Sequence, residues 1–258
     1  MGSQGQQERR YDESRADSSW TGVMEKKLRG RDLKRKVFRA LRGEDSREAM
    51  EVLFQFPARQ VINPLFSLFC NTDQEIRWRA ITAMGAVVAK LAEADMEMAR
   101  VVMRRMIWQL NDESGGIGWG VPEAMGEIMT RHEGLAREYA HMLVSYISAD
   151  GNLLEHVPLQ RGVLWGLGRL AQARPELVQE AVPHLRPYLS ADDDTLRGLA
   201  AWNMGLLRVE TTRSCLEALQ GDAAEVPLYL NWRQSTYRVG DLAKWALEAM
   251  DGQAKVGI

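Results

Sequence analysis

The ten residues IRWRAITAMG at 76–85 decide the fold, because related decapeptides follow at intervals of about 40 residues. They are IGWGVPEAMG at 117–126, LQRGVLWGLG at 159–168, LRGLAAWNMG at 196–205 and a weaker copy, VGDLAKWALE, at 239–248. The first position is aliphatic in all five copies, the fifth is Ala or Val, and the ninth is Met or Leu. Positions 1, 5 and 9 share one stripe of an α-helix, so each decapeptide predicts a helix.

The tenth position of the decapeptide is glycine in the first four copies, at Gly85, Gly126, Gly168 and Gly205. Glycine costs about 1 kcal/mol relative to alanine in the interior of a helix. Glycines in register therefore need a packing reason, and we expect a neighbouring helix to approach closely at these positions.

Each decapeptide follows a second apolar segment that ends in a polar turn. These segments end at 63–73, 104–114, 141–151 and 183–194. The Asp, Ser and Asn residues of such turns are suited to cap the next helix. Strand signals are almost absent, since no alternating Val/Thr run is bounded by a two-residue turn. The sequence predicts an all-α chain, an α-solenoid or superhelix of about five helical-hairpin repeats.

This pattern resembles the HEAT repeat, in the subtype found in phycobilisome lyases (the PBS-lyase HEAT-like repeat). The resemblance rests on an acidic turn, an aliphatic residue, Arg, Ala, Ala and Leu-Gly or Met-Gly, and covers about 46–250. It implies an armadillo-like solenoid whose second helices line the concave face, here around Arg100–Met106 and Arg137–Tyr146. It implies little about function, because HEAT arrays bind proteins, nucleic acids and small molecules.

Composition divides the chain into three parts. Residues 1–20 are polar and almost free of aliphatic side chains, so we expect a disordered tail. Residues 24–42 carry nine Lys or Arg against two acids, a local charge of +7, which leaves −9 for the remainder. We expect a basic amphipathic helical segment over 21–45, with either a solvated basic face or a contact for an acidic partner or nucleic acid. The HEAT-repeat domain would then occupy 46–258.

The overall composition argues against several classes of protein. The net charge is −2, which gives no global field towards DNA or membranes. No apolar run approaches the roughly 18 residues of a membrane helix. Cys70 and Cys215 are the only cysteines, too few for a disulfide framework. We therefore expect a cytoplasmic protein without a membrane partner.

The stretch GGIGWG at 115–120 resembles a phosphate-binding loop only in its glycine content. It lacks the Gly-Lys-Ser/Thr of a Walker loop and fails the GxGxxG fingerprint. Pro122 belongs in the first turn of a helix, so we expect an irregular connection followed by a helix that starts near Val121. The connection is either a flexible turn or a loop for a ligand or partner.

Positions 3 and 7 of the decapeptides carry five of the eight tryptophans, on one side of each helix. Equivalent positions of stacked repeats align in space, so these side chains predict an aromatic ladder with charged neighbours. The candidate contact residues are Trp78, Trp119, Glu123, Glu127, Arg161, Trp165, Arg169, Trp202 and Asn203. The tryptophans either pack between repeats or form an exposed binding surface.

Signals for catalysis, metals and cofactors are weak. The four histidines show no metal-ligand spacing, and we expect no catalytic residue and no cofactor. We expect a non-catalytic scaffold that binds a protein partner, with a small-molecule ligand left open. One alternative is a tetrapyrrole-handling or other cofactor-handling protein, which the resemblance to bilin lyases implies. The other is a nucleic-acid-binding protein similar to HEAT-like DNA glycosylases, which the acidic repeat body disfavours.

Overall fold

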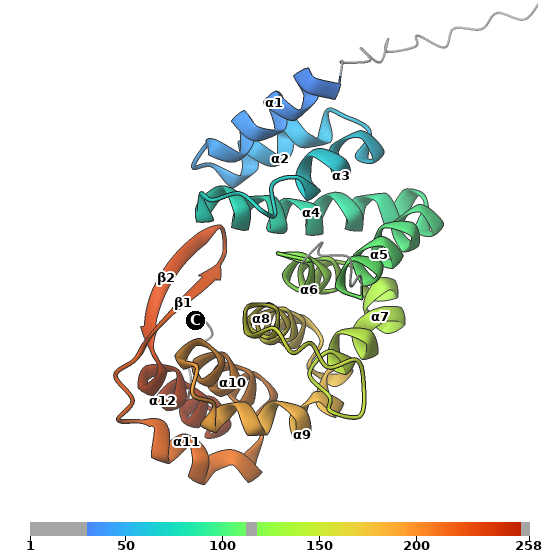
Figure 1. The fold of residues 1–258 in the computed structure, drawn as a ribbon. Helices are drawn as coiled ribbons and strands as arrows, with labels where there is room; N and C mark the ends of the chain where they lie inside the picture. Colours follow the sequence, from blue (N-terminus) through green and yellow to red (C-terminus); the bar gives the residue numbers. More distant parts are fainter. Residues whose placement is uncertain (1–29, 112–117, 254–258) are drawn as a thin grey trace, which may run out of the picture.

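The computed structural model describes residues 30–111 and 118–253 (Figure 1). Its helices are α1 (Gly30–Arg42), α2 (Ser46–Phe54), α3 (Ala58–Phe66), α4 (Gln74–Ala94), α5 (Met96–Leu110), α6 (Val121–Arg131), α7 (Glu133–Ser145), α8 (Val157–Ala173), α9 (Val182–Leu185), α10 (Asp194–Leu207), α11 (Arg213–Leu219) and α12 (Val239–Met250). The 3-10 turns are η1 (Pro175–Leu177), η2 (Gln179–Ala181), η3 (Arg186–Ser190) and η4 (Glu210–Thr212), and the strands are β1 (Glu225–Leu230) and β2 (Arg233–Arg238). The predicted all-α solenoid class is confirmed, with one small hairpin added.

The decapeptides form the inner layer of the solenoid. They lie within α4, α8, α10 and α12, and the second copy runs into the start of α6. These inner helices pack on one another in chain order, while α5, α7 and α9 lie on the outer side of the curve (Figure 1). One apolar core joins the layers along the described chain, from Leu33 to Leu247.

The prediction that the second helices line the concave face is wrong. Arg100–Met106 and Arg137–Tyr146 belong to α5 and α7, in the outer layer. The β1–β2 hairpin lies inside the curve and spans from α12 towards α4 (Figure 1). The side chains of the inner helices pack against this hairpin, so the decapeptides themselves form the concave face.

The expectation of a chain without strands is also wrong. Strands β1 and β2 pair antiparallel from Glu225↔Arg238 to Leu230↔Arg233. The two residues between them, Asn231 and Trp232, have φ of 52° and 67°. Positive φ at both central residues is the type I′ turn, whose backbone twist matches that of the two strands.

The register of glycines marks close contacts between inner helices, as predicted. A Cβ at Gly126 would lie 2.6 Å from the carbonyl oxygen of Gly166 on α8. A Cβ at Gly168 would lie 2.5 Å from the ring of Trp202 on α10. Side chains at these positions would push the repeats apart, which explains glycine where helix propensity favours alanine.

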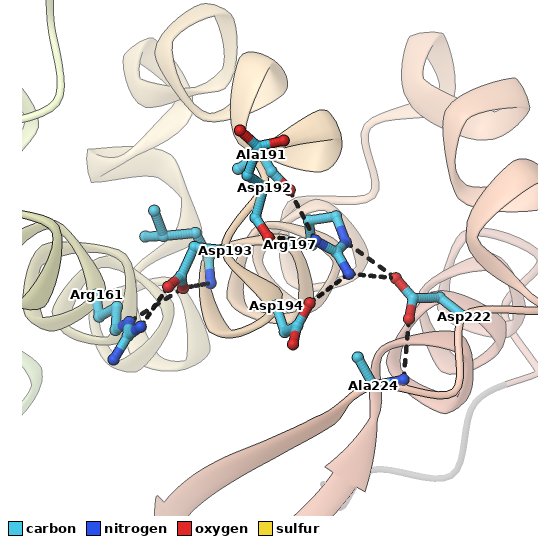
Figure 2. Close-up of polar contacts among 9 residues, drawn as sticks. Arg161, Ala191, Asp192, Asp193, Asp194, Arg197, Asp222 and Ala224 are labelled. Atoms are coloured by element: carbon cyan, nitrogen blue, oxygen red, sulfur yellow. Dashed lines mark hydrogen bonds and ion pairs between the residues drawn. The ribbon is translucent and has the colours of Figure 1, made fainter.

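Acidic turns cap the inner helices α4 and α10, whereas α6, α8 and α12 start without a side-chain cap. The side chain of Asp73 accepts hydrogen bonds from the first-turn amides of α4, and Asp193 does so for α10, as predicted. Arg197 extends this network between turns (Figure 2). Its guanidinium donates to Asp194 at 2.6 Å and Asp222 at 2.9 Å, and to the carbonyl oxygen of Ala191 at 2.8 Å. One arginine thus ties the start of α10 to the turn that precedes β1.

The N-terminal helix packs onto the solenoid. Leu33, Val37 and Leu41 of α1 are buried in the common core. The Arg79 guanidinium of α4 donates to three carbonyl oxygens at the end of α1. The predicted polar tail at 1–20 lies outside the described residues. Over 30–111 and 118–253, no helix combines the length and apolar character needed to cross a membrane.

Replacing Gly126 by alanine tests the helix contact. We expect Gly126→Ala to lower the free energy of unfolding by roughly 1–3 kcal/mol, because the new methyl meets the α8 backbone. This cost exceeds the roughly 1 kcal/mol that alanine gains in helix propensity. The measurement is urea unfolding followed by circular dichroism. Gly221→Ala is the control, since its Cβ would meet no atom within 4 Å. Equal unfolding midpoints for the two variants would contradict the packing account.

Candidate functional site

The tip of the hairpin encloses a pocket of about 410 Å³ against the inner face of the solenoid. We call it the tip pocket. It collects side chains from four helices and from the hairpin turn, so no single repeat forms it. Its lining residues are Ser46, Arg47, Met50, Thr82, Ala86, Glu127, Arg131, Arg169, Tyr229, Leu230, Asn231 and Trp232.

Three polar atoms of the tip pocket are buried: the hydroxyl oxygens of Thr82 and Tyr229 and the indole nitrogen of Trp232. Tyr229 is only 3% exposed. The two hydroxyls lie close together, and a hydrogen bond between them acts to lower the pKa of Tyr229, so the Trp232 indole nitrogen is the atom left without a partner among the described residues. Buried polar groups are hydrogen-bonded in the great majority of cases, so an unpaired indole beside two hydroxyls at one cavity indicates a binding site.

Aromatic packing holds Tyr229 in place. Its ring stacks on that of Trp78, with centroids 5.2 Å apart and planes 7° apart. The indole of Trp165 donates to the Tyr229 carbonyl oxygen at 3.1 Å, and the Trp78 and Trp165 rings lie 4.8 Å apart. The Tyr229 hydroxyl is protonated at neutral pH, as in any tyrosine, and burial raises its pKa further.

A buried carboxylate organises the charges of the tip pocket. Glu127 of α6 is 2% exposed and accepts from Arg169 of α8 at 2.7 Å and from Arg131 at 3.1 Å. Arg47 of α2 is exposed and makes no ion pair with any described residue. Three arginines against one glutamate give the lining a formal charge of +2. Both Glu127 oxygens are occupied, so the free hydrogen-bonding capacity is mostly that of donors.

The backbone at the tip is strained. Trp232 holds φ of 67°, a left-handed conformation that bulky residues rarely adopt. Glycine is the residue preferred at this place in a type I′ turn. A tryptophan that accepts this strain and places its indole in a pocket points to a role beyond closing the hairpin.

The structure brings some of the predicted contact residues to the tip pocket and not others. Glu127 and Arg169 line it, and Trp78 and Trp165 lie directly behind Tyr229. Trp202 packs on Gly168 between α8 and α10. Asn203 is buried at the same interface and donates to the carbonyl oxygens of Leu164 and Leu199. Of the two alternatives for the ladder, burial favours packing between repeats and beneath the hairpin.

The remaining predicted residues lie outside the tip pocket. Glu123 is buried and pairs with Arg77 of α4 at 3.0 Å. Arg161 pairs with Asp193, the residue that caps α10 (Figure 2). Trp119 is half-buried, with its ring edge-on to that of His156 at 5.3 Å. These three residues connect repeats in this structure.

The sequence analysis missed the hairpin and α2 contributions to the tip pocket. Tyr229 and Trp232 lie in LYLNWRQSTYR at 228–238, where an apolar run precedes the turn and a polar run follows it. Neither run alternates, so the stretch lacks the usual sequence signal for a hairpin. Arg131 was detectable, because it follows Glu127 by four residues on one helix. Arg47 carries no such signal.

The glycine-rich connection leads into helix α6. Helix α6 begins at Val121 with Pro122 in its first turn, as predicted, after Gly120 with φ of 72°. Residues 112–117 lie outside the described residues, so the ligand-loop interpretation stays a prediction. Within the described residues, no three His, Cys, Asp or Glu side chains form a group that could hold a metal ion.

The Glu123 carboxyl offers a test by pH. Burial raises its pKa, against the opposing effect of Arg77. Protonation therefore favours the folded state, and this contribution to stability is present below about pH 4.5 and lost as the pH rises through the raised pKa. We expect the stability of Glu123→Gln relative to wild type to increase from about pH 4 to about pH 8. The measurement is urea unfolding across that range.

The matched control for this titration is Glu133→Gln on α7. A hydrogen bond from Arg137 holds the pKa of the exposed Glu133 below its usual value. The stability of Glu133→Gln relative to wild type should therefore decrease slightly as the pH rises. If the difference in free energy of unfolding between Glu123→Gln and wild type were constant with pH, the assignment of a raised pKa to Glu123 would be wrong.

Comparisons with known proteins agree with the architecture. A family model described as a HEAT-like repeat matches residues 157–206, which contain α8 to α10. No curated protein matches the chain. The crystal structure of an engineered protein is 15% identical, with 86% of this chain and 98% of that chain covered and a TM-score of 0.50. A designed armadillo repeat protein in complex with a (KR)4 peptide is 16% identical, with 85% and 99% covered and a TM-score of 0.49. The HEAT-like repeat matched at 157–206 and the stacked inner and outer helices support a HEAT-repeat protein with the fold of an all-α solenoid.

Proposed function

We propose that this chain is a non-catalytic scaffold that binds a protein partner at the tip pocket. The observation that carries the proposal is the unpaired Trp232 indole nitrogen, which lies with the buried hydroxyls of Thr82 and Tyr229 around one cavity. A buried donor costs about 1–3 kcal/mol when it stays unpaired. A partner that supplies acceptors removes this cost, so the site is built to be occupied.

The hairpin favours a protein partner over a small molecule. The described sheet has two strands, so each strand keeps one edge without a ladder partner. The residues of β2 are exposed or half-buried, and the strand starts directly after the pocket residues Asn231 and Trp232. An extended segment of a partner can pair with such an edge and place one end in the pocket, which is β-strand addition.

The other functions considered from the sequence receive less support. The tip pocket contains hydroxyls and guanidinium groups, with its one carboxylate held by two arginines, so it offers no base beside a nucleophile. A tetrapyrrole-handling role would be indicated by visible absorbance of the purified protein. A nucleic-acid role would be indicated by salt-dependent retention on DNA.

Removing the Trp232 indole tests the proposed function. Trp232→Gly creates Asn-Gly, the preferred pair for a type I′ turn, so the hairpin should persist without its pocket side chain. We expect a protein that wild type captures from lysate of the source organism to be lost with Trp232→Gly. The measurement is affinity capture read by mass spectrometry, after circular dichroism has shown that the variant folds.

The matched control is Trp108→Ala, which removes an indole that is 64% exposed on α5 in the outer layer. Capture by wild type and Trp108→Ala, but not by Trp232→Gly, supports the tip pocket. Equal capture by all three baits would contradict it. No captured protein, together with a small molecule in the eluate, would replace the protein partner by a ligand.

A further inference from the structure

We infer that the tip pocket recognises an anionic side chain, a carboxylate or a phosphate, on an extended segment of its partner. This inference rests on the proposed function, because it names the chemistry of the group that the same site accepts. It concerns the charge and hydrogen-bonding character of the pocket, which neither the fold nor the repeat pattern specifies.

The free hydrogen-bonding groups of the pocket are donors. The Trp232 indole nitrogen can only donate, and Arg47 and Arg131 have guanidinium hydrogens that are not used by Glu127. The hydroxyls of Thr82 and Tyr229 can donate as well as accept. Such a set matches a group with several acceptor oxygens and no hydrogens.

The charge of the pocket lining also favours an anionic group. Its formal charge is +2, in a chain whose net charge is −2. Glu127 is the only carboxylate of the lining, and Arg169 and Arg131 bind its two oxygens. The carboxylate therefore positions the two arginines and leaves an excess of positive charge facing the cavity. An anionic group would meet attraction there, and a cationic group would meet repulsion.

The apolar part of the pocket wall also limits which anionic groups fit. Met50, Ala86 and Leu230 supply apolar wall beside the donors. A group that fits both surfaces has an anionic end on an apolar stem, as acidic and phosphorylated side chains do. Strand β2 begins at the pocket, so a segment paired along its edge can direct one such side chain inwards.

Fluorescence anisotropy with labelled peptides tests the inference on the full chain. Four peptides alternate threonine with glutamate, phosphoserine, glutamine or lysine, so only the charged position differs. We expect the glutamate peptide, the phosphoserine peptide or both to bind at least about tenfold more tightly than the glutamine peptide. The affinity should fall as salt is added, because the charges are partly exposed. The stronger of the two anionic peptides identifies the source of the anion.

Arginine variants locate the binding. Arg47→Gln and Arg131→Gln should each weaken the anionic peptide by roughly tenfold, since each removes a charge-assisted hydrogen bond. Arg169 is left intact because it makes the shorter ion pair with the buried Glu127, at 2.7 Å against 3.1 Å for Arg131. Arg39→Gln is the control, an exposed arginine on α1 away from the pocket. Circular dichroism and thermal melting check that all variants fold.

Several results would overturn the inference. They are equal binding of the glutamine peptide, tighter binding of the lysine peptide, no binding of either anionic peptide at millimolar concentration, and equal losses from Arg39→Gln and Arg47→Gln. If the anionic peptides fail while Trp232→Gly still abolishes capture of the partner, the proposed function stands and the anionic class is wrong. If capture also survives Trp232→Gly, both fail.

Discussion

The crossing of α6 and α8 at Gly126 and Gly166 is the contact on which the inner face depends. Neither position has room for a side chain, so the two backbones approach as closely as helices can. The same approach brings Arg169 of α8 to Glu127 of α6 and sets Gly162 beneath Glu123. A wider crossing would draw Arg169 away from Glu127 and leave that buried carboxylate with Arg131 alone, which is destabilising. The close glycine contact and the Arg169–Glu127 ion pair therefore depend on each other.

The β1–β2 hairpin covers aromatic side chains on the concave face of the solenoid. In a bare solenoid, Trp78 and Trp165 would face solvent as a hydrophobic patch on the inside of the curve. Tyr229 stacks on Trp78, and its carbonyl oxygen accepts from Trp165, so the chain covers its own ladder. The inner face is thus partly filled from within, and a pocket of about 410 Å³ remains at the tip of the hairpin. This explains why Trp78 and Trp165, which are of a residue type enriched in binding surfaces, serve mainly as part of the core.

The inner helices could be predicted from sequence because their signal is periodic and local. An aliphatic stripe, a glycine and a capping aspartate recur within a span that one helix covers, as at Asp193 and Gly205. The hairpin escaped because its turn is Asn231–Trp232, whereas the recognised signal for type I′ is Asn-Gly. The site escaped for a different reason. Arg169 and Glu127 are 42 residues apart, and only the stacking of repeats shows that they meet. The concave face was assigned to the wrong helices because the order of helices within a repeat does not determine which layer faces inwards. The hairpin, which covers the inner layer, was not predicted.

Three features at the hairpin tip would be hard to explain if the hairpin were only a structural cover. A glycine at position 232 would form the same turn without strain. Phenylalanine in place of Tyr229 would stack on Trp78 without burying a hydroxyl. A surplus of arginine is unnecessary where one partner would balance Glu127. The strained turn and the buried hydroxyl each cost stability, and both lie at the cavity that the arginines line. Local conflicts with folding rules that gather at a single place are characteristic of function, because a binding partner resolves there what the isolated chain cannot.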